Sequence, residues 1–279
     1  MKMSNKLENT PPQHVLDLEC GSTPADWHRH PNGGGWVYRT ARVAKTAYVG
    51  QNAVIYGNAK VCDDAEVFDS AWVCGNAEIY DNARICGHAE VSGSAKVFGR
   101  ARVCARAAVC GNAEVSENAK IFGRAVVLGS AQVFGRARIF GHAGVGDRAV
   151  VCDNAEVYET ARVWEDAEVY DHAEVCGSAK IYGSAKIYES AKVFGSAMIF
   201  DSAEVCGNAK ICDNAKVFGS AKVCDRAEIF DKVKIFGRAM VCGRASATDD
   251  AKISGDAWVG GDAWVFGDAE VSGSARINE

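Results

Sequence analysis

The stretch AKVCDDAEVFDSAWVCGN (59–76) contains one six-residue unit three times, and the same unit fills most of the chain. Alanine recurs every six residues from Ala41 to Ala275, which gives 40 positions, and only Val233 replaces it. Valine or isoleucine follows two residues after each of these positions, with Ala247 as the one exception. A fixed period without insertion or deletion indicates a repeat architecture.

The unit predicts a short strand followed by a corner. In the pattern Ala-x-Val/Ile the two apolar side chains point to the same face of an extended chain. Gly and Asn then follow, and these residues tolerate the backbone angles of a tight bend. A helix is excluded, because a period of six does not follow 3.6 residues per turn. The sequence therefore predicts an all-β parallel solenoid whose interior stacks Ala on Ala and Val/Ile on Val/Ile.

The units quoted above, and those in AKIYGSAKIYESAKVFGS (179–196), resemble the repeats of hexapeptide-repeat proteins of the acyltransferase-like superfamily. The resemblance covers residues 41–279. It implies a single-stranded left-handed parallel β-helix with three hexads per coil, so 40 hexads would make about thirteen coils. A right-handed solenoid stays open as an alternative, because crossover connections in general favour the right hand.

Residues 1–34 lack the repeat and contain all four prolines of the chain. We expect an irregular N-terminal cap over 1–34 and the hexapeptide-repeat β-helix over 35–279. Within the cap, residues 14–19 (HVLDLE) are predicted to form a short strand. Because the end of a solenoid exposes apolar core and unpaired backbone, Trp27 and Trp36 are expected to cover it.

Composition suggests the surroundings of the protein. The chain has no apolar run long enough to cross a membrane and no apolar leader at its start, so we expect a cytoplasmic protein without a membrane partner. Its net charge of −5 argues against nucleic acid as a partner. The twelve cysteines are expected to be thiols, and the eleven that directly follow a repeat Val or Ile are expected to act as small hydrophobic residues. No metal site is expected, because stacked thiols point in parallel and Cys-x-x-Cys spacing is absent.

An 18-residue coil places opposite charges above one another along one face, as in the series Lys60, Glu78, Lys96 and Glu114. Cross-strand pairs of opposite charge stabilise a sheet. This wall is therefore predicted to fix the register and to face solvent.

A basic band is predicted over residues 84–142. Residues 83–148 contain ten Lys or Arg against four Asp or Glu. Stacked like charges are unfavourable unless an anion lies across them, so we predict a site for a phosphorylated small molecule or an anionic partner. One face supplies Arg84, Arg102, Lys120 and Arg138, and one corner supplies His88, Arg106, Arg124 and His142.

Beside that corner the third face carries no charge. This strip is predicted to be an interface with further copies of the chain, and it comprises Ala108, Cys110, Val126, Leu128, Gly144 and Gly146. The resemblance implies a homotrimer, with coenzyme A along the cleft between subunits and a catalytic histidine beside it. His88 and His142 are the candidates for that histidine.

Two departures weaken the enzyme interpretation. Family acyltransferases interrupt the helix with a protruding loop and append a C-terminal helix, and this sequence has neither. A general base also needs a partner and an acceptor pocket, which the residues near His88 and His142 do not reveal. We therefore favour a non-catalytic binding or scaffold protein. A coenzyme A-dependent acyltransferase and a self-associating structural rod are the alternatives.

Overall fold

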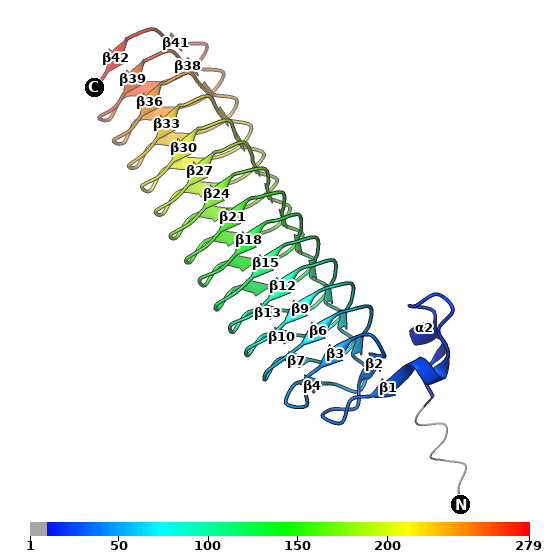
Figure 1. The fold of residues 1–279 in the computed structure, drawn as a ribbon. Coiled ribbons are helices and arrows are strands. Elements are labelled where there is room, and N and C mark those ends of the chain that lie inside the picture. The colour runs from blue at the N-terminus through cyan, green and yellow to red at the C-terminus, as the bar shows by residue number, and fades with distance from the viewer. Residues whose placement is uncertain (1–9) are drawn as a thin grey trace, which may run out of the picture. The chain divides into compact units, whose positions relative to one another are not determined.

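The computed structural model describes residues 10–279. The chain divides into two compact units, of which unit 1 reaches to residue 130 and unit 2 spans 131–279. In both units the repeat forms two-residue parallel strands that alternate with tight turns (Figure 1). Among the described residues, 40 repeat strands, from β3 to β42 and three to a coil, correspond to about 13 coils. The predicted all-β parallel solenoid is confirmed.

From Gly57 to Gly273, each turn of the repeat contains one residue with a positive φ. Glycine occupies this position in many coils, as at Gly75 (φ 68°), and Asp or Glu occupies it in others, as at Asp63 (φ 55°). The left-handed region is costly for residues with a Cβ atom and least so for Gly, Asn and Asp. A carboxylate at this position accepts the backbone N–H of the residue one coil later, as from Gly99 to Asp81 at 3.0 Å.

In unit 1 the strands form three ladders. The first ladder begins with β1 (Trp27–Arg29), which pairs antiparallel with β2 (Trp36–Tyr38). Parallel pairing then continues from β2 through β5 (Val54–Ile55), β8 (Trp72–Val73), β11 (Glu90–Val91), β14 (Ala108–Val109) and β17 (Val126–Val127). The second comprises β4 (Tyr48–Val49), β7 (Glu66–Val67), β10 (Arg84–Ile85), β13 (Arg102–Val103) and β16 (Lys120–Ile121). The third comprises β3 (Arg42–Val43), β6 (Lys60–Val61), β9 (Glu78–Ile79), β12 (Lys96–Val97) and β15 (Glu114–Val115).

Unit 2 repeats this pattern in three parallel ladders. The first contains β20 (Gly144–Val145), β23 (Arg162–Val163), β26 (Lys180–Ile181), β29 (Met198–Ile199), β32 (Lys216–Val217), β35 (Lys234–Ile235), β38 (Lys252–Ile253) and β41 (Glu270–Val271). The second contains β19 (Arg138–Ile139), β22 (Glu156–Val157), β25 (Glu174–Val175), β28 (Lys192–Val193), β31 (Lys210–Ile211), β34 (Glu228–Ile229), β37 (Ser246–Ala247) and β40 (Trp264–Val265). The third contains β18 (Gln132–Val133), β21 (Val150–Val151), β24 (Glu168–Val169), β27 (Lys186–Ile187), β30 (Glu204–Val205), β33 (Lys222–Val223), β36 (Met240–Val241), β39 (Trp258–Val259) and β42 (Arg276–Ile277).

The repeat alanines and aliphatic residues form the interior of each coil. Ala71 and Val73 in unit 1 are fully buried, as are Ala203 and Val205 in unit 2. Burial of one branched side chain contributes about 1.5–3 kcal/mol, so each added coil stabilises its neighbours through three such residues. The six-residue repeat of the sequence is therefore also the repeat of the buried side chains.

The 18-residue register is visible in the surface ladders. Lys60 pairs with Glu78 at 2.6 Å, and Lys96 pairs with Glu114 at 3.2 Å, which confirms the predicted charged wall. The aromatic side chains that follow the strands stack on one another, as Phe200 does on Phe218 with ring centroids 4.8 Å apart.

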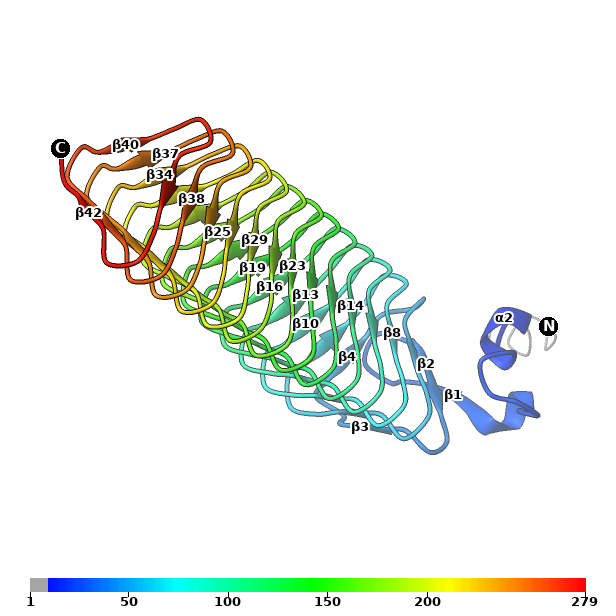
Figure 2. The ribbon, with the colours of Figure 1, turned by 90° about the horizontal axis from the view of Figure 1, so that it is seen from above.

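The prediction of a strand over 14–19 is wrong. This segment forms a short helix, α2 (Gln13–Leu16), after Pro12, and a 3-10 turn (Pro24–Asp26) follows it (Figure 2). The spacing of the apolar residues in this segment is compatible with a strand and with a helical turn. The helical turn is preferred because it buries Val15 against Trp27 and Trp36. No helix in the described residues is long and apolar enough to cross a membrane.

The expectation that all cysteines are thiols is also wrong. Cys86 and Cys104 form a disulfide across adjacent coils, with their Cα atoms 4.6 Å apart. Stacking in register places the two Cα atoms within the range that a disulfide requires. The other ten cysteines are free.

Candidate functional site

Unit 1 contains a cavity of about 570 Å³ between the N-terminal segment and the ladder of β2, β5, β8 and β11. Cavities of this size accommodate small organic ligands. Its polar and aromatic lining includes His14, Arg29, Trp36, Trp72, His88 and Glu90. Sequence reasoning missed the cavity, because it exists only where the N-terminal segment folds over the first coils.

Arg29 provides a fixed positive charge in the cavity wall. Its Nη1 donates hydrogen bonds to the carbonyl oxygens of Gly34 at 2.5 Å and Gln51 at 2.9 Å. The guanidinium carbon lies 3.9 Å from the ring centroid of Trp36, a cation–π distance. Partial burial lowers the pKa of Arg29, although an arginine remains protonated in proteins.

The sheet side of the cavity is aromatic and then acidic. Trp72 on β8 is the register neighbour of Val54 before it and Glu90 after it. Trp72 is half-buried and packs against the apolar cluster that contains Val15. The cavity therefore has an apolar floor at Trp72 and a carboxylate at its far edge.

His88 lies at the corner where the cavity meets a basic ladder. The His88 backbone N–H donates to the carbonyl of Ala105 at 2.5 Å, and the Arg106 N–H donates to that of Gly123 at 2.8 Å. These bonds stack the corner positions of His88, Arg106 and Arg124 on consecutive coils, and all three residues are exposed. Within residues 10–279, neither arginine forms an ion pair. The structure thus brings together the three residues of the predicted corner that belong to unit 1, namely His88, Arg106 and Arg124.

The predicted sheet ladder is also assembled in unit 1. Arg84, Arg102 and Lys120 are consecutive register neighbours on β10, β13 and β16. Arg84 is neutralised by Glu66, whose Oε2 lies 2.9 Å from the arginine Nε. Arg102 and Lys120 are exposed and form no ion pair in the described part of the chain.

The unit 2 members of the predicted band have different surroundings. Arg138 pairs with Glu156 at 2.6 Å, so its charge is compensated. His142 is exposed at its corner. Gly144 is half-buried and Gly146 is buried, because the indole of Trp164 from the next coil lies against Gly146.

The uncharged strip of unit 1 continues the ladder that lines the cavity. Ala108 follows Glu90 in the register, and Val126 follows Ala108. Cys110 and Leu128 come directly after these strands, and all four strip residues are half-buried. Burial raises the pKa of the Cys110 thiol, which therefore stays neutral beside the strip.

A second basic groove, of about 620 Å³, lies in unit 2. Lys180, Lys216, Lys232 and Lys234 line it together with Met198. Among the residues that the structure describes, these lysines form no ion pair. The sequence indicates this groove only through spacing, because Lys216 and Lys234 are 18 residues apart and so stack on adjacent coils. A search for a local excess of positive charge misses it, because acidic residues lie between these lysines in the sequence.

No protein-family model and no curated protein matches this chain. The parallel solenoid rests on the structure itself. Membership of the hexapeptide-repeat superfamily and the left hand of the coil stay predictions.

Proposed function

We propose that this protein binds a phosphorylated small molecule in the unit 1 cavity and does not transform it. The observation that supports the proposal is the position of His88. It lines the cavity, and the next two coils carry the unpaired guanidinium groups of Arg106 and Arg124 at the same corner, so the ladder of cations begins at the cavity wall.

The two parts of the site suit the two parts of such a ligand. A guanidinium donates paired hydrogen bonds that match the geometry of phosphate, so Arg106 and Arg124 would hold the phosphate groups. A ring or apolar portion would lie on Trp72. An anion across the ladder would also relieve the repulsion between stacked cations. Ligand binding should therefore raise the stability of the protein.

A coenzyme A-dependent acyltransferase is the second candidate, because His88 lines the same cavity. A general base must be within hydrogen-bonding reach of the proton it takes and benefits from an orienting partner. Within residues 10–279, the His88 side chain has no such hydrogen bond. Binding without catalysis is therefore the simpler function.

Assembly into a homotrimer through the strip Ala108, Cys110, Val126 and Leu128 is part of the proposal. It is supported by the resemblance and by the absence of charge on these half-buried residues. Native mass spectrometry tests it: the wild type should be three chains, and Val126→Asp with Leu128→Asp should be one. A wild-type monomer, or an open series of larger species typical of a rod, would refute the trimer.

A thermal-shift panel tests ligand binding. Coenzyme A, ATP and inorganic pyrophosphate are added to the full chain, to Arg106→Glu with Arg124→Glu, and to the matched variant Lys216→Glu with Lys234→Glu in the unit 2 groove. Coenzyme A and pyrophosphate should raise the Tm of the wild type and of the unit 2 variant, and not that of the unit 1 variant. The proposal fails if no anion raises the wild-type Tm, or if the unit 2 variant alone loses the shift.

A further inference from the structure

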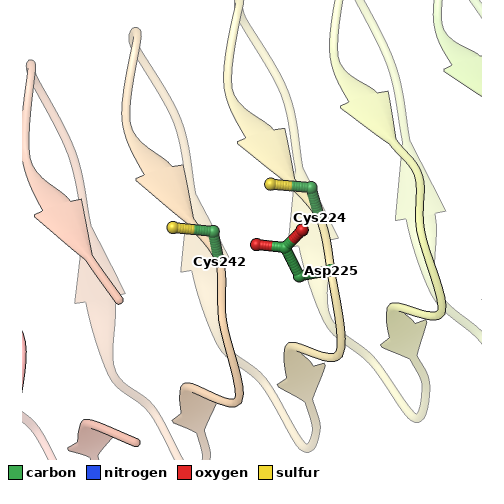
Figure 3. Close-up of side chains that lie close together, drawn as sticks. All are labelled: Cys224, Asp225 and Cys242. Carbon is green, nitrogen blue, oxygen red and sulfur yellow. The ribbon is translucent and has the colours of Figure 1, made fainter. Parts of the chain in front are cut away.

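Unit 2 contains a cluster of two thiols and a carboxylate that the ligand proposal does not use. The Sγ atoms of Cys224 and Cys242 and a carboxylate oxygen of Asp225 lie within 4.8 Å of one another (Figure 3). Cys242 is only 9% exposed, Cys224 is half-buried and Asp225 is exposed. The cluster is therefore sheltered on its thiol side and open to solvent on its carboxylate side.

The register of two adjacent strands places the thiols together. β33 and β36 pair in parallel, with Val223 opposite Val241, and a cysteine directly follows each strand. The backbone N–H of Cys224 donates to the carbonyl of Val241 at 2.9 Å. Both side chains point to the same side of the coil (Figure 3).

Asp225 brings a third donor into the space between the coils. Its φ is 61°, in the left-handed region that the turn requires. Its Oδ2 accepts the backbone N–H of Gly243, the residue after Cys242, at 2.9 Å. This bond holds the carboxylate beside the thiol of the next coil, and a hydrogen bond of this kind is typical of a carboxylate that ligates a metal.

A related corner in unit 2 lacks the second thiol. The Sγ of Cys212 lies 3.1 Å from Oδ2 of Asp213, and the same carboxylate accepts the backbone N–H of Asp231 at 3.4 Å. The residue 18 positions after Cys212 is Phe230, so this corner offers one sulfur where the Cys224 corner offers two. It serves as an internal control.

We propose that Cys224, Asp225 and Cys242 form a zinc site with an open fourth position. Two thiolates favour zinc over magnesium or calcium, and three protein ligands leave one position for water. Three atoms within 4.8 Å of one another leave a centre within about 2.8 Å of each (4.8 divided by √3). Zinc–sulfur bonds are about 2.3 Å and zinc–carboxylate bonds about 2.0–2.2 Å, so each sulfur needs to move by at most about 0.5 Å and the carboxylate oxygen by at most about 0.8 Å. The sequence expectation of no metal considered the thiols alone and omitted Asp225.

Cobalt substitution tests the site on the reduced, chelator-treated full chain. Co²⁺ should produce a thiolate-to-cobalt charge-transfer absorption, and Zn²⁺ should abolish it. The absorption should be lost in Cys224→Ser and in Cys242→Ser and kept in Cys212→Ser. Asp225→Asn, which still accepts the Gly243 N–H, should weaken Zn²⁺ binding by about tenfold or more, measured by competition with a chromophoric chelator.

Circular dichroism and Tm of the metal-free variants establish that each is folded. The proposal is overturned if the wild type gives no charge-transfer absorption or if the absorption survives in Cys242→Ser. Cys206 follows β30 and lies one coil before Cys224, because Val205 is the register neighbour of Val223. The proposal is also overturned if Cys206→Ser removes the absorption while Asp225→Asn leaves zinc affinity unchanged, because the site would then be a pair of Cys206 and Cys224. Failure of the unit 1 ligand proposal would not affect this result.

Discussion

Arg84 forms an ion pair with Glu66 one coil earlier, at 2.9 Å, and faces Arg102 one coil later in the register. The compensated part of this ladder therefore ends at Arg84, and Arg102 and Lys120 follow as adjacent uncompensated cations. Other positions alternate charge, as in the pair of Lys60 and Glu78 at 2.6 Å, although like charges are also register neighbours in unit 2, as at Lys216 and Lys234. A protein that keeps like charges adjacent gives up stability at that position, which is reasonable where an anion binds.

Removal of this repulsion should stabilise the protein without ligand. Arg102→Glu would place a carboxylate between Arg84 and Lys120, and we expect a gain of about 0.2–1 kcal/mol. The urea midpoint measures it. Lys96→Glu, which places a third carboxylate between Glu78 and Glu114 and removes the ion pair with Glu114, is the matched control and should lower the midpoint by a similar amount. A lower midpoint for Arg102→Glu would contradict the interpretation of the ladder.

His88 is expected to contribute to binding and not to turnover. His88→Ala should weaken the affinity for a phosphorylated ligand by up to about tenfold, because a hydrogen bond to a charged group is lost. His142→Ala, in unit 2, should leave the affinity unchanged. Assays of acetyl-coenzyme A consumption should show no turnover by the wild type. Turnover that His88→Ala abolishes would instead establish the acyltransferase.

Acid should remove one contribution to the stability of unit 2. Lys222 Nζ donates to Glu204 at 3.0 Å, and this bond is the main cause that lowers the pKa of Glu204 below its ordinary value of 4.5. Because the folded pKa is depressed, the stabilisation is complete above the unfolded pKa and is lost as the pH falls through the folded one. Both side chains are more than a third exposed, so about 1 kcal/mol or less is expected.

The urea midpoints of the wild type and Glu204→Gln measure this effect. Their difference should be constant between about pH 6 and 8 and should shrink as the pH falls below 4.5. A difference that stays the same at all these pH values would show that the ion pair contributes nothing that depends on ionisation of Glu204.

Gly146 should tolerate no side chain while Trp164 is present. A Cβ atom at this position would overlap the indole ring, so Gly146→Ala should cost about 1–3 kcal/mol through overpacking. In the background of Trp164→Ala the same substitution should cost much less, and a double-mutant cycle in urea gives the coupling energy. Additive effects of the two substitutions would mean that Trp164 does not lie on Gly146.

The repeat could be predicted because the residues of each hexad themselves determine where its strand, its turn and its buried side chains lie. Alanine and valine at fixed positions predict the buried interior, and Lys60 with Glu78 predicts the register. Features that depend on one particular neighbour could not be predicted in this way. The helix at Gln13–Leu16 forms because Val15 packs on Trp27 and Trp36, which lie outside the alanine repeat.

The site was predictable only for residues that stack at 18-residue spacing. His88, Arg106 and Arg124 belong to this class. The cavity required the fold of the N-terminal segment, which has no period. Asp225 is one of many corner acids in the sequence, and its value as a ligand follows from the bond to Gly243, which joins it to the second thiol.

The most direct test of the ligand proposal is calorimetric titration of coenzyme A and of inorganic pyrophosphate into three forms of the protein: the wild type, Trp72→Ala, and Arg106→Glu with Arg124→Glu. The wild type should bind both probes. Trp72→Ala should weaken coenzyme A alone, and the arginine variant should weaken both. Absence of binding heat in the wild type, or affinities that none of these substitutions changes, would contradict a phosphate site at the edge of this cavity.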